Sequence, residues 1–247
     1  MGTFLKLPNG RKRNVPKLPK LPNYQKERRR YIINLAQKIL QLIYPPTCSI
    51  CKAPSQEYLC KKCQKKLNQI ELLSQENAIN NYFDECIHGF IYEGIIRKLI
   101  LQYKFEHKPY IYRTFINFFK KNEKLYLLFK KYDIIVPVPI SKNRYKFRGY
   151  NQSSLLAKEF AGIFDLDFEG NILIKIKNNP KQSTLSQEER FLNTQGVYKI
   201  NKNAKIINKN ILLLDDVFTT GATCNECAKV LKEAGAGKVG VFTIAKD

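Results

Sequence analysis

The stretch ILLLDDVFTTGATC, residues 211–224, carries most of the information about the fold of this chain. Residues 211–214 are all apolar, which predicts a short buried strand. Two adjacent acids, Asp215 and Asp216, follow directly, and after a Thr- and Gly-rich loop an apolar periodic segment begins at Thr223. Burial of the strand would deliver both carboxylates to a fixed place at its end.

The loop after the two acids has the composition of an anion-binding turn. Hydroxyl donors, a glycine and the start of a helix lie together in Thr219, Thr220, Gly221, Ala222 and Thr223. The unpaired N–H groups and partial positive charge of a helix N-terminus favour a phosphate there. The carboxylates before the loop can accept hydrogen bonds from neighbouring sugar hydroxyls, so we expect a ribose 5-phosphate ligand. An acid pair that holds Mg²⁺, as in phosphatases, is the alternative.

The composition is that of a globular protein with an anionic partner. The chain has 247 residues, 44% of them apolar, and a formal net charge of +22. This length allows one substantial core and a small additional module. The charge favours nucleic acid, a phosphorylated ligand or an anionic membrane as partner, although a basic surface without a partner is the simpler alternative. The sequence lacks a Walker A lysine motif, so we do not expect hydrolysis of nucleoside triphosphates.

Four cysteines form two C-x-x-C pairs in TCSICKAPSQEYLCKKC: Cys48, Cys51, Cys60 and Cys63. Each pair can present two thiolates to one metal from a tight turn, and the residues between the pairs suffice for a short hairpin. This spacing predicts a closed, structural Zn²⁺ site, with an iron–sulfur cluster as the alternative. The flanking lysines, which could contact phosphate, are Lys61, Lys62, Lys65 and Lys66.

The remaining cysteines predict packing and a reducing compartment. Cys224 and Cys227 lie on the same stripe of the expected helix as Ala228 and Leu231, which indicates core packing. A clustered set and an odd total of seven cysteines argue against a disulfide framework. No apolar run reaches the ~20 residues of a membrane span, and the first residues lack the apolar core of a secretory signal. We therefore expect a soluble, cytoplasmic protein.

Three regions are expected along the chain. Residues 1–30 are basic and interrupted by prolines, which predicts a flexible basic tail or a nucleic-acid-binding arm. Residues 31–75 hold an amphipathic helix, which starts near Ile32 and ends before Pro45, and the cysteine module. Residues 76–247 form the third region.

This third region alternates between helical and strand-like patterns. We expect helices over 94–105, 153–164 and 223–234. Strand-like runs are 134–138, 172–176, 197–200, 211–214 and 239–244. Such alternation predicts an α/β fold with a mostly parallel sheet and helices on both faces.

Several stretches together resemble one known family. The segment ILLLDDVFTTGAT, residues 211–223, is similar to the phosphoribosyl-pyrophosphate (PRPP) binding motif of type I phosphoribosyltransferases. The cysteine pairs, YEGIIRKLILQYKF (92–105), VPVPISKNRYKFRGYNQSSLLAKEFA (136–161) and QSTLSQEERFLN (182–193) occur in the order of the ComF family of late-competence, DNA-uptake proteins. The resemblance covers roughly residues 32–247. KNNPKQ (177–182) departs from the expected Arg-rich run, which puts the reactivity of that loop in doubt.

The resemblance implies a role for each matched residue. Asp215 and Asp216 would take the ribose hydroxyls, directly or through Mg²⁺, and act in catalysis, while residues 219–223 would hold the 5-phosphate. Residues 139–141, with Arg144 and Arg148, would face the pyrophosphate. Residues 177–193 would be a mobile hood over the site.

Two functions of different class follow. The first is a phosphoribosyltransferase with an unidentified acceptor, since the sequence contains no recognisable pocket for an accepting base. The second, which we favour, is a PRPP-binding accessory protein that engages single-stranded DNA or a DNA-uptake helicase through its zinc module and basic surface. Both could coexist in one chain.

Overall fold

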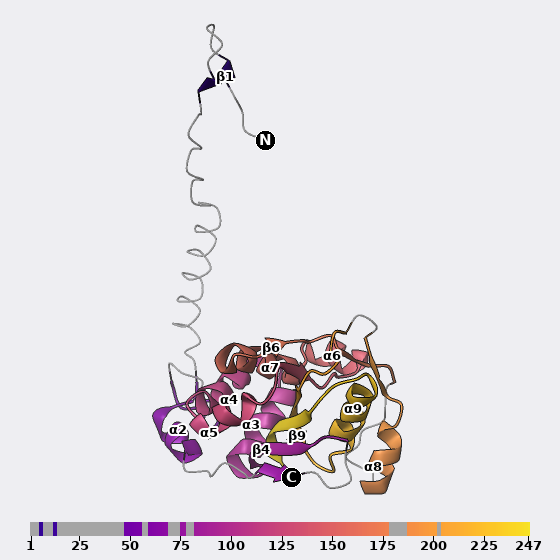
Figure 1. Cartoon of the computed structure of the whole chain (residues 1–247). Helices are drawn as coiled ribbons and strands as arrows, with labels where there is room; N and C mark the ends of the chain where they lie inside the picture. Colours follow the sequence, from indigo (N-terminus) through magenta and orange to yellow (C-terminus); the bar gives the residue numbers. More distant parts are fainter. Residues whose placement is uncertain are drawn as a thin grey trace. The chain divides into compact units, whose positions relative to one another are not determined.

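The computed structural model divides into two units, Met1–Pro45 and Pro46–Asp247, and the second contains nearly all of the described residues (Figure 1). The described residues are 5–6, 12–13, 47–55, 59–68, 75–77, 82–177, 187–201 and 204–247. In the first unit, strands β1 (Leu5–Lys6) and β2 (Lys12–Arg13) pair antiparallel. The rest of the predicted tail and the helix predicted from Ile32 lie outside the described residues.

A six-stranded sheet forms the centre of the second unit, with the strand order β3-β4-β10-β9-β5-β6. The strands from β4 to β6 are parallel, and β3 pairs antiparallel with β4 at one edge. Their bounds are β3 (Gln75–Asn77), β4 (Glu85–Ile91), β10 (Val239–Lys246), β9 (Ile211–Phe218), β5 (Ile134–Pro137) and β6 (Asp167–Phe168). The predicted mostly parallel sheet is confirmed.

Strand β9 lies in the middle of the sheet, and its apolar residues serve both faces. Leu212 and Leu214 belong to one buried cluster, whereas Ile211 and Leu213 belong to another. Strands of a parallel sheet are buried on both sides, so they read as continuous apolar runs. This explains why the four apolar residues before the acids predict a strand.

Together with α2 (Lys61–Asn68), four helices that follow β4 in sequence contribute to the cluster on one face of the sheet. They are α3 (Gly94–Phe105), α4 (Tyr112–Phe119), α5 (Glu123–Phe129) and α7 (Gln152–Phe164). A short 3-10 helix, η1 (Pro109–Ile111), precedes α4. Leu99, Phe115, Phe129 and Phe160 are fully buried here. The predicted helices α3 and α7 are confirmed, whereas α4 and α5 were not predicted. No helix within the described ranges combines the length and the hydropathy of a membrane-spanning segment.

Helix α9 (Ala222–Glu233) and a hairpin contribute to the cluster on the other face. The hairpin pairs β7 (Leu173–Lys175) antiparallel with β8 (Tyr198–Ile200), apart from the main sheet, and α8 (Gln187–Thr194) lies between them in sequence. Leu173 is buried but Ile174 is 37% exposed. This run is therefore buried on one side only, which suits a hairpin and not a parallel strand buried on both faces.

The connections of β5 and β9 run in opposite directions. From β5 the chain passes through α7 to β6, and from β9 it passes through α9 to β10 on the other side. The crevice between the carboxyl ends of such diverging neighbours is where open α/β sheets bind ligands.

Candidate functional site

A cavity of about 780 Å³ lies at the carboxyl ends of β5 and β9. Its lining includes residues that follow β5, residues at the end of β9 and beyond, and the last residues of α3. Ligand-binding pockets span about 300–1,000 Å³, so the cavity has the size for a small molecule.

Both predicted acids line this cavity, because β9 extends further than expected. The strand continues through Asp215 and Asp216 to Phe218 beside β10, whereas β5 ends at Pro137, opposite Leu214. The predicted strand end at Leu214 is therefore too early. Pairing with β10 keeps the backbone of the acids extended, and the end of β5 leaves space next to them.

Asp216 is enclosed, and the protein itself contacts both of its carboxylate oxygens. Its side chain is 6% exposed, and Lys104 Nζ lies 2.8 Å from Oδ1. Gln152 Nε2 donates a hydrogen bond to Oδ2 at 2.7 Å. Arg148 donates in turn to Gln152 Oε1. Helices α3 and α7 thus anchor this acid.

Asp215 receives its hydrogen bonds from described residues on one oxygen only. Ser153 Oγ donates to Oδ1 at 3.0 Å, and the backbone N–H of Asp216 donates to the same oxygen at 2.9 Å. Burial, followed by the negative charge of Asp216, raises the pKa of Asp215 to about 7. A perturbed carboxyl group in a cavity is typical of functional sites.

The predicted phosphate loop, residues 219–223, also lines the cavity and leads from β9 into α9. Gly221 precedes the helix with a φ of 74°, a left-handed conformation that favours glycine. A Cβ atom there would lie 2.6 Å from Cζ of Phe218. The loop therefore brings backbone N–H groups and threonine hydroxyls to the wall next to the acids.

A basic wall follows β5. Pro139 and Ile140 line the cavity, and Ser141 is buried and caps helix α6 (Lys142–Arg148) by accepting a hydrogen bond from the N–H of Arg144 at 3.3 Å. Both predicted arginines line the cavity. Arg144 is exposed, whereas Arg148 is buried, and this burial lowers the pKa of its guanidinium group.

Several polar residues that line the cavity were not predicted, among them Lys104, Gln152 and Lys175. The first two lie inside stretches that carried the family resemblance, so those stretches held a signal. No pattern pointed to Lys175, which the hairpin brings to the cavity, where its Nζ donates to the Tyr198 hydroxyl at 3.3 Å. Burial lowers the pKa of Lys175. Of the predicted hood, residues 178–186 lie outside the described residues.

The four predicted zinc ligands lie together. The Sγ atoms of Cys48, Cys51, Cys60 and Cys63 are all within 4.8 Å of one another. In a tetrahedral Zn²⁺ site with Zn–S bonds of about 2.3 Å, sulfurs stand about 3.8 Å apart, and the Sγ atoms of Cys51 and Cys60 are 3.6 Å apart. The cluster is consistent with structural zinc.

The backbone around Cys48 also favours the thiolate form, which is the form that binds a metal. Burial opposes ionisation of Cys48, but the backbone N–H groups of Cys51, Cys60 and Ile50 outweigh it and lower the pKa of Cys48 to about 6. Cys48 and Cys63 are buried in the same core cluster as α3. The flanking lysines are exposed on α2 (Lys61–Asn68), as Lys61, Lys62, Lys65 and Lys66.

The second C-x-x-C pair is part of the core, as predicted. Cys224 and Cys227 are 2% and 0% exposed and pack with Ala228 and Leu231 under the sheet. Burial raises the pKa of both thiols, which keeps them protonated.

Two family models match the chain. Residues 39–73 match the double zinc ribbon domain, and residues 150–247 match the phosphoribosyl transferase domain. The first range contains the four clustered cysteines. The second contains α7, both acids and the loop at α9.

Curated competence proteins are similar over larger parts of the chain. Competence protein ComFC of Streptococcus pneumoniae is 35% identical over 157 residues, which are 64% of this chain and 66% of that protein. ComFC of Bacillus subtilis is 30% identical over 206 residues, 81% of this chain and 78% of that protein. Competence protein F of Haemophilus influenzae is 28% identical over 81% of this chain and 85% of its own length.

Among solved structures, an adenine phosphoribosyl transferase from Trypanosoma brucei superposes with a TM-score of 0.40 at 15% identity, over 74% of this chain and 67% of that chain. A superposition this loose places no ligand in the cavity. The family therefore rests on the sequence matches, and the B. subtilis match extends over more than three quarters of both chains. This chain belongs to the ComF/ComFC family of competence proteins.

Proposed function

We propose that the cavity binds PRPP with Mg²⁺, and that the protein uses this site while it assists the uptake or processing of single-stranded DNA in the cytoplasm during natural transformation. One observation carries the first part. A single cavity at the switch point of the sheet gathers an anion-binding loop, a partly partnered acid and two arginines. The phosphoribosyl transferase match and the names of the competence relatives support the proposal.

The loop at residues 219–223 would hold the 5-phosphate. Helix α9 has 12 residues, and its first N–H groups have no partner within the helix. With the threonine hydroxyls, they offer several donors to one phosphate group. Gly221 allows the backbone to approach the ligand closely, because no side chain stands in front of it.

The two acids divide the work on the ribose. Asp215, with Oδ2 free of hydrogen bonds from described residues, accepts from the ribose hydroxyls or from water on Mg²⁺. Asp216 is already paired with Lys104 and Gln152. It thereby fixes the position of the neighbouring Asp215 and the negative charge next to it. Mg²⁺ held in this way would offset part of the negative charge of the pyrophosphate group.

Arg144 and Arg148 would face the pyrophosphate. Arg148 is held by its hydrogen bond to Gln152, so its guanidinium group is fixed before a ligand arrives. Arg144 is exposed and can adjust to the ligand. Lys175 adds a further cation from the hairpin.

True phosphoribosyl transfer is the second candidate. Transfer passes through a cationic sugar, and a carboxylate near that sugar stabilises the developing charge. If the ribose lies at the end of β9, Asp215 and Asp216 place their carboxylates near the sugar, as this stabilisation requires. Turnover of isotope-labelled PRPP, with candidate acceptors and without any, tests this. Turnover that Asp215→Asn abolishes supports an enzyme, and binding without turnover supports the accessory role.

The zinc module would be structural and would support contacts with DNA or with a DNA-uptake helicase. All four ligand positions are filled by cysteines, so no coordination site remains for catalysis. Metal analysis should find one Zn²⁺ per chain. Serine at Cys48, Cys51, Cys60 or Cys63 should remove it, whereas Cys224→Ser should not. Loss of zinc only from Cys224→Ser would contradict the assignment.

A further inference from the structure

Helix α6 presents an alternation of cations and aromatic rings to solvent. Its sequence is KNRYKFR, and all residues from Lys142 to Phe147 are exposed. Surface helices normally bury their apolar side. Here Tyr145 is 54% exposed and Phe147 is 65% exposed. The aromatic rings of α6 therefore do little to hold the helix on the core.

A third exposed ring meets α6 at the cavity. Phe105, the last residue of α3, is 58% exposed, and Phe105 and Phe147 both line the cavity, whereas Tyr145 does not. Arg148 Cζ lies 5.7 Å from the ring centroid of Phe105, and the His107 ring lies 5.5 Å from that of Phe147. Single exposed apolar residues are ordinary, but two rings beside one cationic cavity form a pattern.

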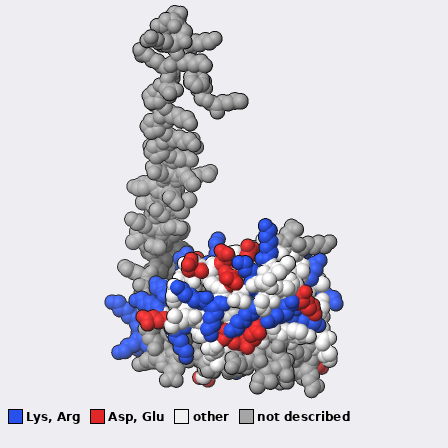
Figure 2. Space-filling view, viewed as in Figure 1, with Lys and Arg blue, Asp and Glu red and all other residues white. Residues whose placement is uncertain are grey.

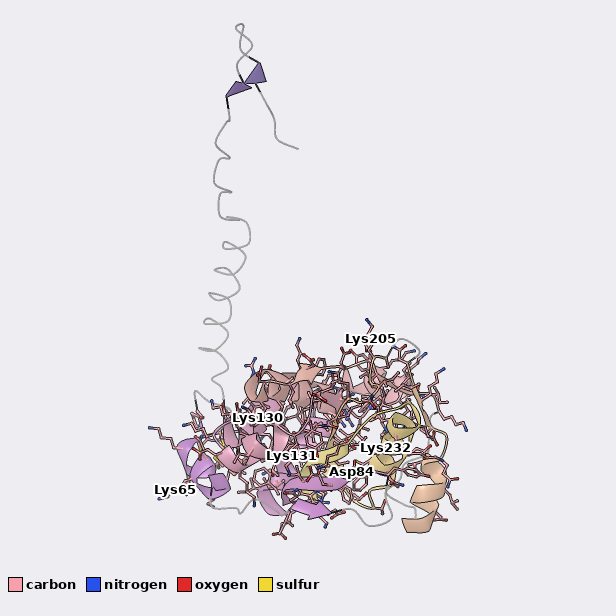
Figure 3. All side chains as sticks on the ribbon, viewed as in Figure 1. Lys65, Asp84, Lys130, Lys131, Lys205 and Lys232 are labelled. Atoms are coloured by element: carbon pink, nitrogen blue, oxygen red, sulfur yellow. The ribbon has the colours of Figure 1, made fainter. Side chains whose placement is uncertain are left out.

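Charge alone does not locate a partner on this protein. Figure 2 shows Lys and Arg spread over the visible face of the described residues, with no single stripe. Lys65 on α2 lies at the lower left of the second unit in Figure 3, far from Lys205 at its top. The mouth of the cavity differs, because exposed rings stand between the cations there.

Rings interleaved with cations suit one class of ligand. Bases of a single strand expose their flat faces, and each base stacked on an aromatic side chain contributes about 1–3 kcal/mol, while neighbouring cations attract the phosphates. In a duplex these faces are already stacked. Duplex DNA would therefore use the cations but leave the rings unused.

We propose that Phe105 and Phe147, together with Lys142, Arg144 and Lys146, form a stacking platform for the bases of single-stranded nucleic acid at the mouth of the cavity. The proposal rests on the DNA-handling part of the proposed function and gives it a second surface, distinct from the tail and the zinc module. Because Arg144 lines the cavity and also borders the rings, a bound strand lies next to the ribose phosphate ligand.

Fluorescence anisotropy with a labelled oligothymidylate tests the platform on the full chain. The Phe105→Leu/Phe147→Leu variant keeps apolar bulk and removes both flat faces. We expect its Kd to rise by about tenfold or more, as the loss of one to two stacked bases requires. Tyr145→Leu is the matched control, since it changes an exposed ring on the same helix but off the cavity, and its Kd should change less than about twofold.

The salt dependence separates stacking from charge. Loss of the two rings should leave the slope of log Kd against log salt unchanged, because no phosphate contact is lost. Lys142→Gln/Lys146→Gln should reduce that slope by about 0.7 for each phosphate contact removed. The zinc content and the urea unfolding of the ring variant should match those of the wild type and thereby show an intact fold, since both rings are exposed.

Each contrary outcome has a distinct meaning. Equal oligonucleotide affinity of the ring variant and the wild type overturns the platform and leaves strand binding to the tail and the zinc module. Ring-dependent binding of thymidine 5′-monophosphate without ring-dependent oligonucleotide binding overturns it in favour of a small-ligand base site. A wild type that binds oligonucleotide but no PRPP contradicts the proposed ligand and not the platform.

Discussion

The two edges of the sheet hold the half-buried Asp215 and the buried Glu85, and the pKa values of these two acids shift in opposite directions. At the carboxyl edge, burial and a neighbouring acid raise the pKa of Asp215 to about 7. At the amino edge, Glu85 begins β4 and is 3% exposed, yet its pKa lies below the ordinary value of 4.5. The difference lies in what surrounds each carboxylate.

Glu85 is fully compensated. Burial alone would raise its pKa, but the Tyr132 hydroxyl donates to Oε1, and Lys238 Nζ lies 2.9 Å from the same oxygen. Lys131 Nζ lies 3.6 Å from the other carboxylate oxygen, Oε2. The ion pair of Asp84 and Lys232 lies in the same part of the molecule (Figure 3). Gly240 pairs with Glu85 and makes this possible, because a Cβ there would lie 1.9 Å from the Tyr132 hydroxyl.

The comparison separates an acid that holds the fold from an acid kept for a ligand. A compensated carboxylate stabilises the native state, whereas a buried one with incomplete compensation costs stability. Proteins retain such a destabilising carboxylate at sites where function requires it. We therefore expect substitutions at the two edges to have opposite effects on stability and on PRPP binding.

The largest expected effect is at the amino edge. Glu85→Gln leaves two lysines without their buried counter-charge and should lower the free energy of unfolding at pH 7 by about 2–3 kcal/mol. PRPP affinity should not change. Urea unfolding measures the first quantity, with Glu233→Gln, an exposed partner of Lys229, as a control that should cost under about 0.5 kcal/mol.

The pH dependence of this cost follows from the lowered pKa of Glu85. The stabilisation from the group is present above its unfolded value of 4.5 and is lost as the pH falls through the folded value below it. The gap between wild type and Glu85→Gln should therefore close in acid. A gap that is constant from neutral to acidic pH would mean that the charge of Glu85 does not hold this edge.

The next effect is on the ligand. Asp215 must be ionised to accept hydrogen bonds from ribose hydroxyls, and with a pKa of about 7 its ionised fraction rises steeply between pH 6 and pH 8. PRPP affinity should increase by about tenfold over this range, which corresponds to about 1.4 kcal/mol. Calorimetry at several pH values checks this, with Asp215→Asn as the control, which should lose the dependence.

Asp215→Asn should also make the protein more stable, the reverse of Glu85→Gln. Above pH 7 the folded wild type carries a partly desolvated charge on Asp215, whereas the unfolded chain, in which the pKa of this group is 3.8, carries the charge in water. This penalty on the stability of the folded state grows as the pH rises from about 4 to about 7. The variant should therefore have a higher Tm than the wild type at pH 8 and the same Tm near pH 4. A gain of about 1 kcal/mol would raise Tm by about 2–4 °C. A lower Tm at pH 8 would assign Asp215 a structural role.

Much of this arrangement followed from the sequence because it is local. The apolar run before Asp215 predicted a buried strand, the Thr and Gly loop predicted a helix start, and the cysteine spacing predicted the cluster. Residues that meet only through tertiary packing were missed. Lys104 reaches Asp216 from α3, and Lys175 reaches the cavity because β7 leaves the main sheet.

The amino edge shows the same limit. Nothing in the local pattern around Glu85 indicates a contact with Tyr132, which lies 47 residues further along the chain, or with Lys238, which lies further still. The strand β4 itself was missed, since Glu85 and His88 interrupt its apolar run although both are buried. A polar residue buried by distant partners gives no periodic signal.

Calorimetric titration of PRPP with Mg²⁺ into the wild type and into Asp215→Asn/Asp216→Asn at pH 8 tests the central claim most directly. We predict one site in the wild type and at least about a tenfold weaker affinity in the variant, a loss of about 1.4 kcal/mol or more. Glu85→Gln, in the same titration, should bind as the wild type does. Equal affinity of the wild type and the double aspartate variant would contradict the assignment of the carboxyl edge as the PRPP site.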